Sequence, residues 1–388
     1  MENNNKNIEE IIIVGAGPAG ALTGYFLSKA GFKVTVFDRN KEPKRKVCGE
    51  YLCPLGVNLL KDLGLGSLLE DFSLVHGMKI VSPKYTPVFT FFPEDGKSSY
   101  GVSVNRQVLD SRIRELAKNE GCCFIEGMSV TSIEKSHLGW SVFVGDESYC
   151  CDLLIAADGV NSSIAQKLGH KKKGKHDRVA LHTYLSFKDS KAHSRLGQMH
   201  IFSDGSYVGI NPIDQNEVNY SVVCNSDELK ENSKEELINR YIKSSPELAD
   251  IFSLVDKQSK IQVAGSIKNS NSHIAGDGLA YVGDSSGFID PLTGEGIFNA
   301  LQSAHMLSQS IITSPNEEAL REYKREKIKY FREKNILNLF FQLLIRSPFI
   351  CERIAKYLNR KQERANVFVG IIGNIYRPLE GLLKMIKN

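Results

Sequence analysis

The chain opens with apolar runs that suit the strands of a parallel sheet. Residues 11–14 and 34–37 are almost wholly apolar, and a glycine-rich turn and a segment with helical spacing lie between them. Short apolar runs of this kind are typical of strands buried on both faces. The pattern therefore predicts a strand, a helix and a second parallel strand, which is the beginning of an α/β domain.

The pattern changes in the middle of the chain, from about residue 179 to residue 263. Apolar and polar residues alternate there in short segments: VALHTYLSF, GQMHIF, SYVGINPI and EVNYSVVC. Such alternation favours an antiparallel sheet with one buried face. An amphipathic segment, SKEELINRYIKSSPEL, interrupts the strands and predicts a helix.

The C-terminal region combines apolar runs with positive charge. From Arg321 onward it has 16 Lys and Arg against 6 Asp and Glu, a net charge of +10, so the rest of the +4 chain carries −6. The run ILNLFFQLLI is about half as long as a bilayer span, and Arg377 and Glu380 interrupt the next run. This region predicts helices that cover the first domain or line a lipophilic tunnel, or that dock on a membrane surface.

Composition narrows the class of protein. A chain of 388 residues has room for two or three domains, and 41% hydrophobic with 24% charged residues is ordinary for a globular protein. A net charge of +4 gives no reason to expect nucleic acid as a partner. Eight cysteines without a disulfide framework, and a polar N-terminus unlike a signal peptide, predict a cytoplasmic protein.

The first turn carries a dinucleotide fingerprint. Gly15, Gly17 and Gly20 have the G-x-G-x-x-G spacing, in which they permit the tight turn, the approach of a pyrophosphate and close helix packing. Pro18 and Ala19 then begin a helix whose free N–H groups attract phosphate.

The second strand ends in Asp38, followed by Arg39. The Asp38 carboxylate can accept hydrogen bonds from the ribose hydroxyls of an adenosine. A chance glycine turn is the alternative, and the fingerprint alone does not choose between NAD and FAD.

Three later segments extend this pattern. A strand followed by Asp158 and Gly159 is predicted by the segment DLLIAADGVNSSIAQKLG. A strand that ends at Gly283 and Asp284, then a loop, then a helix from about Gly296 are predicted by the segment GLAYVGDSSGFIDPLTGEGIFNALQSA. In VSVNRQVLD an arginine opens a helix.

These segments, in this order, resemble the flavoprotein hydroxylase superfamily typified by p-hydroxybenzoate hydroxylase, over about residues 8–310. Within it, the run GFIDPLTGEGI and the Cys-Gly turn in KVCGEYL are similar to the geranylgeranyl reductase family. The resemblance implies FAD as cofactor and NADH or NADPH as electron donor. It also implies the fold class, α/β (α+β overall), with a Rossmann-like three-layer FAD domain, an inserted antiparallel-sheet substrate domain and a C-terminal helical region.

The fingerprint and the resemblance together predict the cofactor-binding residues. Asp284 is expected at the FAD ribityl chain, and Arg106 at the phosphates with Asp110 capping or orienting it. The second motif departs from the superfamily pattern, because Ile164–Ala165–Gln166 stands where an arginine is usual, which affects the donor rather than FAD. The full predicted set is Gly15, Gly17, Pro18, Ala19, Gly20, Asp38, Arg39, Arg45, Arg106, Asp158, Gly159, Gly283, Asp284, Gly294, Gly296 and Ile297.

The turn KRKVCGEYLCP supplies the catalytic candidates, Cys48 and Glu50. A zinc clip or a redox pair is disfavoured because no C-x-x-C spacing exists, so no metal is expected and Cys53 is interpreted as structural. Basic neighbours, among them Arg45 and Lys46, are expected to lower the pKa of Cys48. Glu50 is either a solvated surface acid or a group that binds substrate or moves a proton.

The substrate-binding candidates are Tyr207, Gly209, Asn211 and Pro291. The run YVGINP has the frame of an aromatic-x-Trp-x-Phe-Pro run in the reductases, or of Trp-x-Trp-x-Ile-Pro in the related halogenases, but Gly209 replaces the tryptophan. The one tryptophan of the chain lies elsewhere, at Trp140. The space that glycine leaves suggests a substrate different from a simple prenyl chain.

We expect reduced flavin to saturate a carbon–carbon double bond of a lipophilic, isoprenoid-like substrate. The alternative is an NAD(P)H-dependent monooxygenase that hydroxylates a lipophilic or aromatic substrate, and a minor alternative is a non-catalytic flavin-binding protein. Peripheral membrane contact through the basic C-terminal region stays open. The expected FAD-binding domain comprises residues 1–77, 101–170 and 272–330, the substrate domain 78–100 and 171–271, and the C-terminal helices 331–388.

Overall fold

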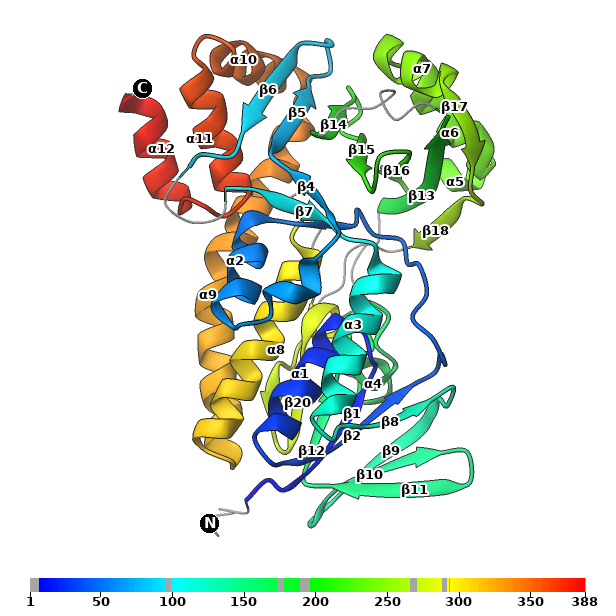
Figure 1. Ribbon diagram of the computed structural model, residues 1–388, viewed down its shortest axis with the longest axis vertical. Helices are drawn as coiled ribbons and strands as arrows, with labels where there is room; N and C mark the ends of the chain where they lie inside the picture. The colour runs from blue at the N-terminus through cyan, green and yellow to red at the C-terminus, as the bar shows by residue number, and fades with distance from the viewer. Residues whose placement is uncertain are drawn as a thin grey trace.

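A computed structural model describes residues 7–94, 99–172, 178–188, 196–265, 271–287, 292 and 294–387. It has the mixed α/β architecture that the sequence predicts, with a parallel sheet, antiparallel sheets and C-terminal helices (Figure 1).

A six-stranded sheet forms the centre of the first half. Its neighbouring strands pair in parallel except β19 with β20. In spatial order the strands are β19 (Ala275–Gly276), β20 (Leu279–Tyr281), β12 (Leu153–Ala156), β1 (Glu10–Val14), β2 (Lys33–Asp38) and β8 (Cys123–Glu126).

Both faces of this sheet are covered, which explains why its strands read as apolar throughout. Ile11 and Ile13 of β1 pack with the helices α1 (Pro18–Lys29), α3 (Arg106–Asn119) and α8 (Gly296–Thr313). Ile12 and Val14 pack with a small sheet that contains Trp140. The strands of that sheet are β9 (Val130–Ser136), β10 (Gly139–Val144) and β11 (Glu147–Cys151). The helices, the six-stranded sheet and the small sheet therefore form three layers.

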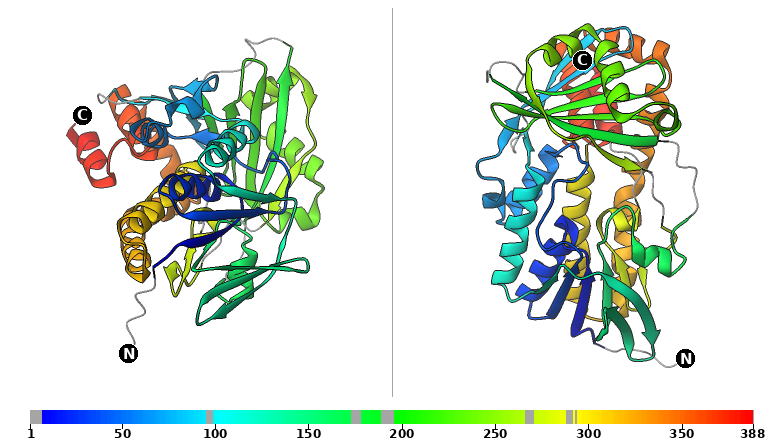
Figure 2. Two further views of the ribbon diagram at one scale, coloured as in Figure 1. Left: turned by 60° about the horizontal axis from the view of Figure 1, so that its bottom comes forward. Right: turned by 90° about the vertical axis from the view of Figure 1, so that its right-hand side faces the viewer.

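An eight-stranded sheet forms the second half of the molecule and lies above the first in the right panel of Figure 2. All its pairs are antiparallel except β14 with β5. Along the sheet the strands are β17 (Val255–Gln258), β13 (Arg178–Phe187), β16 (Glu217–Asn225), β15 (Tyr207–Pro212), β14 (Gly197–Ile201), β5 (Gly77–Val81) and β6 (Pro87–Phe91), and β18 (Gln262–Gly265) pairs with β13.

The helix predicted between these strands is two helices, α6 (Lys234–Lys243) and α7 (Pro246–Ser253). The break follows from Pro246, which disfavours helical geometry in the residue before it and begins a new helix. Apolar residues of both helices pack on one face of the large sheet. The other face is directed toward the first half of the molecule.

The remaining elements before the C-terminal helices are short. They are β3 (Tyr51–Leu52), β4 (Ser73–Val75) and β7 (Gly101–Ser103), which form a three-stranded sheet, the helices α2 (Pro54–Asp62), α4 (Ser163–Lys167) and α5 (Glu228–Glu231), and the 3₁₀ turns η1 (Gly66–Leu69) and η2 (Gly283–Ser286).

Four helices form the end of the chain: α9 (Glu317–Ile345), α10 (Pro348–Leu358), α11 (Gln362–Ile372) and α12 (Pro378–Lys387). Helix α9 runs without a break through the predicted boundary at residue 330, first along α8 and then past the large sheet (Figure 1). In the described parts of the chain, no helix is both long and apolar enough to traverse a bilayer.

Candidate functional site

The glycine turn after β1 has a geometry that only glycine permits at two positions. Gly15 has φ +106°, and a Cβ on it would lie 2.5 Å from the Ala157 carbonyl oxygen. A Cβ on Gly20 would lie 1.9 Å from the carbonyl oxygen of Gly15. At Gly17 the only described atom within 4 Å of such a Cβ, apart from the adjoining chain, is Lys46 Nζ, at 3.8 Å. The N-terminus of α1 is therefore open where a phosphate would meet it.

Asp38 stabilises this turn. Its Oδ2 accepts a hydrogen bond from the Ala16 N–H at 2.7 Å and lies 3.4 Å from Arg114 Nη2. Arg114 is buried, donates to the Ala16 carbonyl at 3.0 Å and pairs with Glu126 at 2.6 Å. Sequence analysis did not predict Arg114, whose helical spacing resembles that of an ordinary surface cation. Arg39, which follows Asp38, is exposed.

Arg106 is held at the start of α3. Its guanidinium donates two hydrogen bonds to Asp110, both 2.9 Å, and its Nη1 lies 3.6 Å from Cys48 Sγ. Its backbone N–H donates to Glu50 Oε1 at 3.1 Å. Asp110 therefore orients Arg106, while the helix is capped by Asn105, which accepts hydrogen bonds from the following N–H groups.

The distant motifs converge on Asp284. Burial raises the pKa of Asp284 to about 6, against the opposing charges of Arg106, Lys46 and Lys327. Since Lys46 also reaches the glycine turn, the glycine turn, Arg106 and Asp284 belong to one site. A Cβ on Gly283 would lie 2.9 Å from Ala19 Cβ, so the third motif also contacts α1.

Lys327 comes to this site from α9 and was missed by sequence analysis. It is buried, and its Nζ donates to Ser286 Oγ and, at 3.1 Å, to the Tyr323 hydroxyl. Burial lowers its pKa to about 7, although Asp284 acts in the opposite direction. A C-terminal helix thus contributes directly to the third motif.

The second motif leaves one polar atom unpaired. Asp158 Oδ2 accepts hydrogen bonds from Ser163 and Ile164, whereas its Oδ1 is buried without a partner. Gly159 follows with φ +82°. Ile164 and Ala165 are packed in the core under the small sheet.

The loop before α8 completes this half of the site. Gly294 has φ +67°, and a Cβ on it would lie 2.9 Å from the Tyr51 ring. Gly296 begins the helix, and among the described residues no atom beyond its chain neighbours and its own helix backbone lies within 4 Å of its Cβ position. Ile297 is buried. Pro291 lies outside the described residues.

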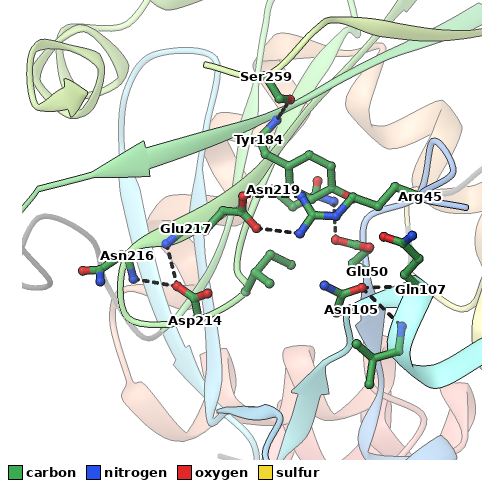
Figure 3. Close-up of polar contacts among 12 residues, drawn as sticks. Arg45, Glu50, Asn105, Gln107, Tyr184, Asp214, Asn216, Glu217, Asn219 and Ser259 are labelled. Atoms are coloured by element: carbon green, nitrogen blue, oxygen red, sulfur yellow. Dashed lines mark hydrogen bonds and ion pairs between the residues drawn. The ribbon is translucent and has the colours of Figure 1, made fainter. Parts of the chain in front are cut away.

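Glu50 is fully buried, so it is not a solvated surface acid. It has φ +50°, and its carbonyl accepts a hydrogen bond from Asn211 Nδ2 at 2.9 Å. Asn219 Nδ2 lies 2.7 Å from the Cys48 carbonyl oxygen and 3.5 Å from Glu50 Oε2, and the Tyr184 ring lies alongside (Figure 3). Burial raises the pKa of Glu50 more than its hydrogen-bond donors lower it.

The prediction that basic neighbours lower the pKa of Cys48 was wrong. Burial raises the pKa of this thiol, and the charge of Arg106 offsets only part of the effect. Cys48 Sγ accepts a hydrogen bond from the Glu50 N–H at 3.4 Å. Cys53 is buried, with a pKa raised to about 11. Within the described residues, no three His, Cys, Asp or Glu side chains form a group that could hold a metal.

Arg45 points to the large sheet rather than to the glycine turn. Its Nη2 lies 3.0 Å from Glu217 Oε2, and its guanidinium lies 3.9 Å from the centre of the Tyr184 ring (Figure 3). Lys46 is therefore a better candidate than Arg45 for contact with a phosphate.

Tyr207, Gly209 and Asn211 share the face of β15 that is directed toward the first half, because alternate residues of a strand face the same way. Tyr207 is buried beside Phe341 of α9. Asn211 also accepts a hydrogen bond from Ser103 Oγ at 3.0 Å, so it joins the two halves. In the described part of the chain, no atom beyond the chain neighbours lies within 4 Å of the Cβ position of Gly209, which agrees with the space expected there.

His182 lies on the same face and was also missed. It is fully buried, neither ring nitrogen has a hydrogen-bond partner, and its ring centre lies 4.6 Å from that of Tyr184. Burial, with a smaller effect of Arg45, lowers its pKa to about 4, so the ring is neutral. The alternation in VALHTYLSF places His182 with Tyr184, and this was the available signal.

The shared face changes from polar to apolar along the strands. Tyr184 and Asn219 lie beside Glu50, and His182 and Gly209 follow in the next row. The row after that is apolar and packs against α9; it comprises Ala180, Val223, Tyr207 and Ile201. A cavity of about 40 Å³ lies beyond it, lined by residues that include Ile201, Leu344 and Phe368. The face is therefore polar beside Glu50 and apolar toward α9.

A glycine turn at a helix N-terminus, an acid ending the next strand and later motifs that return to the same turn define a dinucleotide-binding fold of the flavoprotein type. The chain belongs to the FAD binding domain family, which matches residues 9–330.

Curated relatives are distant. The chain is 29% identical to menaquinone reductase of Mycobacterium tuberculosis over 312 residues, covering 77% of this chain and 76% of that protein. It is 27% identical to digeranylgeranylglycerophospholipid reductase of Methanococcus vannielii, covering 83% of each. It is 24% identical to conditioned medium factor receptor 1 of Dictyostelium discoideum, covering 93% of this chain and 76% of that protein.

Solved structures share the fold. A geranylgeranyl bacteriochlorophyll reductase-like protein of Thermoplasma acidophilum superposes with a TM-score of 0.78 at 19% identity, covering 98% of this chain and 99% of that one. The halogenase PltM in complex with phloroglucinol and FAD superposes with a TM-score of 0.77 at 17% identity, covering 98% of this chain and 85% of that one.

The residues present fit FAD. The open Gly17 position, the unpaired Asp158 Oδ1 and the free space at Gly296 are places where a ligand can approach the backbone or pair with a buried oxygen. Lys46 and Arg106 supply positive charge for phosphates beside them.

Proposed function

We propose that this protein is an FAD-dependent oxidoreductase that saturates a carbon–carbon double bond of a lipophilic, isoprenoid-like substrate. The observation that carries the proposal is the large-sheet face, polar beside Glu50 and apolar toward α9. Relatives named as reductases of menaquinone and of a digeranylgeranyl lipid support the substrate class.

Saturation of a double bond needs a hydride on one carbon and a proton on the other. Reduced FAD, when bound, would supply the hydride. Burial raises the pKa of Glu50 from its ordinary acidic value toward neutral pH, which suits a group that delivers a proton. Burial also raises the pKa of the Cys48 thiol, so this thiol stays protonated beside it. Asn219 and Arg106 hold this turn in place by the hydrogen bonds described above.

In this proposal Lys46 and Arg106 lie at the phosphates of FAD. The residues that surround FAD are Gly15, Gly17, Pro18, Ala19, Gly20, Asp38, Asp158, Gly159, Gly283, Asp284, Gly294, Gly296 and Ile297. NADH or NADPH supplies the electrons. The protein acts in the cytoplasm, and a lipid-soluble substrate makes peripheral membrane contact useful.

Hydroxylation is the second candidate, because the open space at Gly209 would admit a bulkier or aromatic substrate. In that case an NAD(P)H-dependent enzyme would place an oxygen atom on the substrate.

Mass spectrometry separates the two candidates. The dithionite-reduced holoenzyme is mixed under argon with menaquinone carrying an unsaturated chain, or with a geranylgeranyl lipid. We expect a product heavier by two hydrogen atoms. Incorporation of ¹⁸O from labelled oxygen, with no anaerobic product, would establish hydroxylation instead.

The roles at the turn are tested by Cys48→Ala and Glu50→Gln, which should each slow product formation at least 10-fold while leaving the flavin absorbance unchanged. Cys150→Ala, at an exposed thiol far from the turn, is the control. Full activity of both turn variants would reject the assigned roles.

A further inference from the structure

Helix α9 has two apolar sides in its second half. Phe341 and Ile345 are buried against the large sheet, beside Tyr207. The outer side carries Ile336, Leu339, Phe340 and Leu343, whose side chains are 54–64% exposed. Their spacing of i, i+3, i+4 and i+7 places them in one stripe. A helix that only covered a core would present polar residues there.

Helix α12 repeats this arrangement. Gly381 and Met385 face α11, and a Cβ on Gly381 would lie 2.3 Å from Ile371 Cγ1. The opposite side carries a stripe with the same spacing, 52–75% exposed: Leu379, Leu382, Leu383 and Ile386. We call these eight exposed residues of α9 and α12 the outer stripes. The two helices lie on the same side of the molecule in Figure 1 and in the left panel of Figure 2.

The outer stripes belong to a concentrated apolar surface. Of the 20 large hydrophobic side chains exposed in the described residues, 10 lie between residues 336 and 386. Phe349 and Ile350, at the start of α10, are among them. Exposed apolar side chains concentrated in this way favour a contact with another molecule or a membrane.

The charge of the region around the outer stripes favours an anionic partner over a second copy of the chain. Residues 331–388 contain 11 Lys and Arg against 4 Asp and Glu, a net charge of +7. The exposed cations include Arg353, Lys356, Arg360, Arg377 and Lys387. Two copies of the chain that met through this region would bring two positive surfaces together, whereas anionic lipid headgroups would be attracted.

We infer that the outer stripes of α9 and α12 dock on an anionic lipid bilayer, so that α9 separates the bilayer from the apolar row of the large sheet. The docking itself follows from the exposed residues and their charge. The further step, entry of the substrate chain from the bilayer past α9, rests on the proposed function.

Vesicle co-sedimentation tests the docking. The FAD-loaded full chain is mixed with vesicles of phosphatidylcholine alone or with 30 mol% phosphatidylglycerol, at low and high salt. We expect binding to the anionic vesicles that salt weakens. The double substitution Leu382→Ser/Leu383→Ser should lower the bound fraction at least fivefold, and so should Leu339→Ser/Phe340→Ser.

Leu138→Ser is the matched control, because Leu138 is 66% exposed on the distant β9–β10 turn. It should bind like the unchanged protein. Thermal unfolding and flavin absorbance of every variant show whether the fold is retained. Absence of binding by the unchanged protein would overturn the inference. A dimer in light scattering that the stripe substitutions convert to monomer, without vesicle binding, would also overturn it and assign the surface to self-association.

Substrate delivery is tested separately. If the substrate enters from the bilayer, the stripe variants should lose activity on menaquinone in anionic vesicles but keep it on the same substrate in detergent. Equal loss in both would reject entry past α9. Vesicle binding without saturation of any lipid would reject the proposed function while leaving the docking intact.

Discussion

Glu50 shows how burial decides the chemistry of a residue. In the sequence it is one acid among 45 Asp and Glu residues, next to a basic run. In the structure it has left-handed backbone geometry, no exposed surface, and donors from α3 and β16 at its carboxylate. The same burial raises the pKa of Cys48, which the basic neighbours alone were expected to lower.

Asp284 provides a pH test. Its folded-state pKa, raised to about 6, lies above the usual value of about 3.9 for an unfolded chain. The folded protein therefore binds the proton more tightly, and this group lowers the stability of the FAD-free protein as the pH rises from about 4 through about 6. Asp284→Asn should remove this loss, up to about 3 kcal/mol at pH 7.

Urea unfolding of the FAD-free protein between pH 4.5 and 7.5 measures the effect. Asp146→Asn, at an exposed carboxylate, should follow the unchanged protein. An Asp284→Asn variant with the same pH dependence as the unchanged protein would contradict the assignment.

At the scale of elements, periodicity located most strands and helices. The strand–turn–helix–strand at the start, the alternating strands of the large sheet and the helix from Gly296 are in the structure where the pattern predicts them. These features depend on local preferences and on one-sided or two-sided burial, which the sequence records directly. The pattern did not predict that α9 is one helix across the expected boundary, since its length depends on packing against both halves.

The packing of α1 on β1 makes a prediction for this element. Gly20→Ala would place a Cβ 1.9 Å from the Gly15 carbonyl, so α1 must move away from the turn. We expect a loss of about 3 kcal/mol or more in the free energy of unfolding, and weaker FAD binding. Gly265→Ala, where no described atom beyond the chain neighbours lies within 4 Å of the new Cβ, should change stability by less than about 1 kcal/mol.

Chemical denaturation and FAD fluorescence quenching measure the two effects. Retained stability and FAD affinity in Gly20→Ala would show that the turn tolerates the displacement.

At the scale of the whole molecule, a few polar contacts join the two halves beside the site. Asn211 and Asn219 bind the backbone of the Cys48–Glu50 turn, and Arg45 pairs with Glu217. We expect Arg45→Met and Glu217→Gln to show a coupling energy of about 1 kcal/mol in a double-mutant cycle, because this pair is half-buried and also stacks on Tyr184.

The exposed pair Lys230–Asp227 is the reference for that cycle, and we expect a weaker coupling there because solvent screens both charges. Thermal unfolding of the four FAD-loaded proteins in each cycle supplies the numbers. Equal coupling in both cycles would show that the Arg45 contact does not join the halves.

The sequence by itself determined the dinucleotide fingerprint, the identity of the later motifs and the two kinds of sheet. Each of these depends on residues that are close in the chain: glycines where a Cβ cannot fit, apolar runs, and alternation along a strand. The resemblance of the motifs to a known family then predicted the fold class, which the structure and the family match confirm.

Only the tertiary structure decided which distant groups meet. Lys327 reaches the third motif from α9, Arg114 braces Asp38, Arg45 pairs with Glu217 rather than lying at the glycine turn, and His182 is buried without a partner. Such outcomes depend on long-range contacts and on the cost of removing charge from water. The spacing of residues along a chain gives no information about either the long-range contacts or this cost.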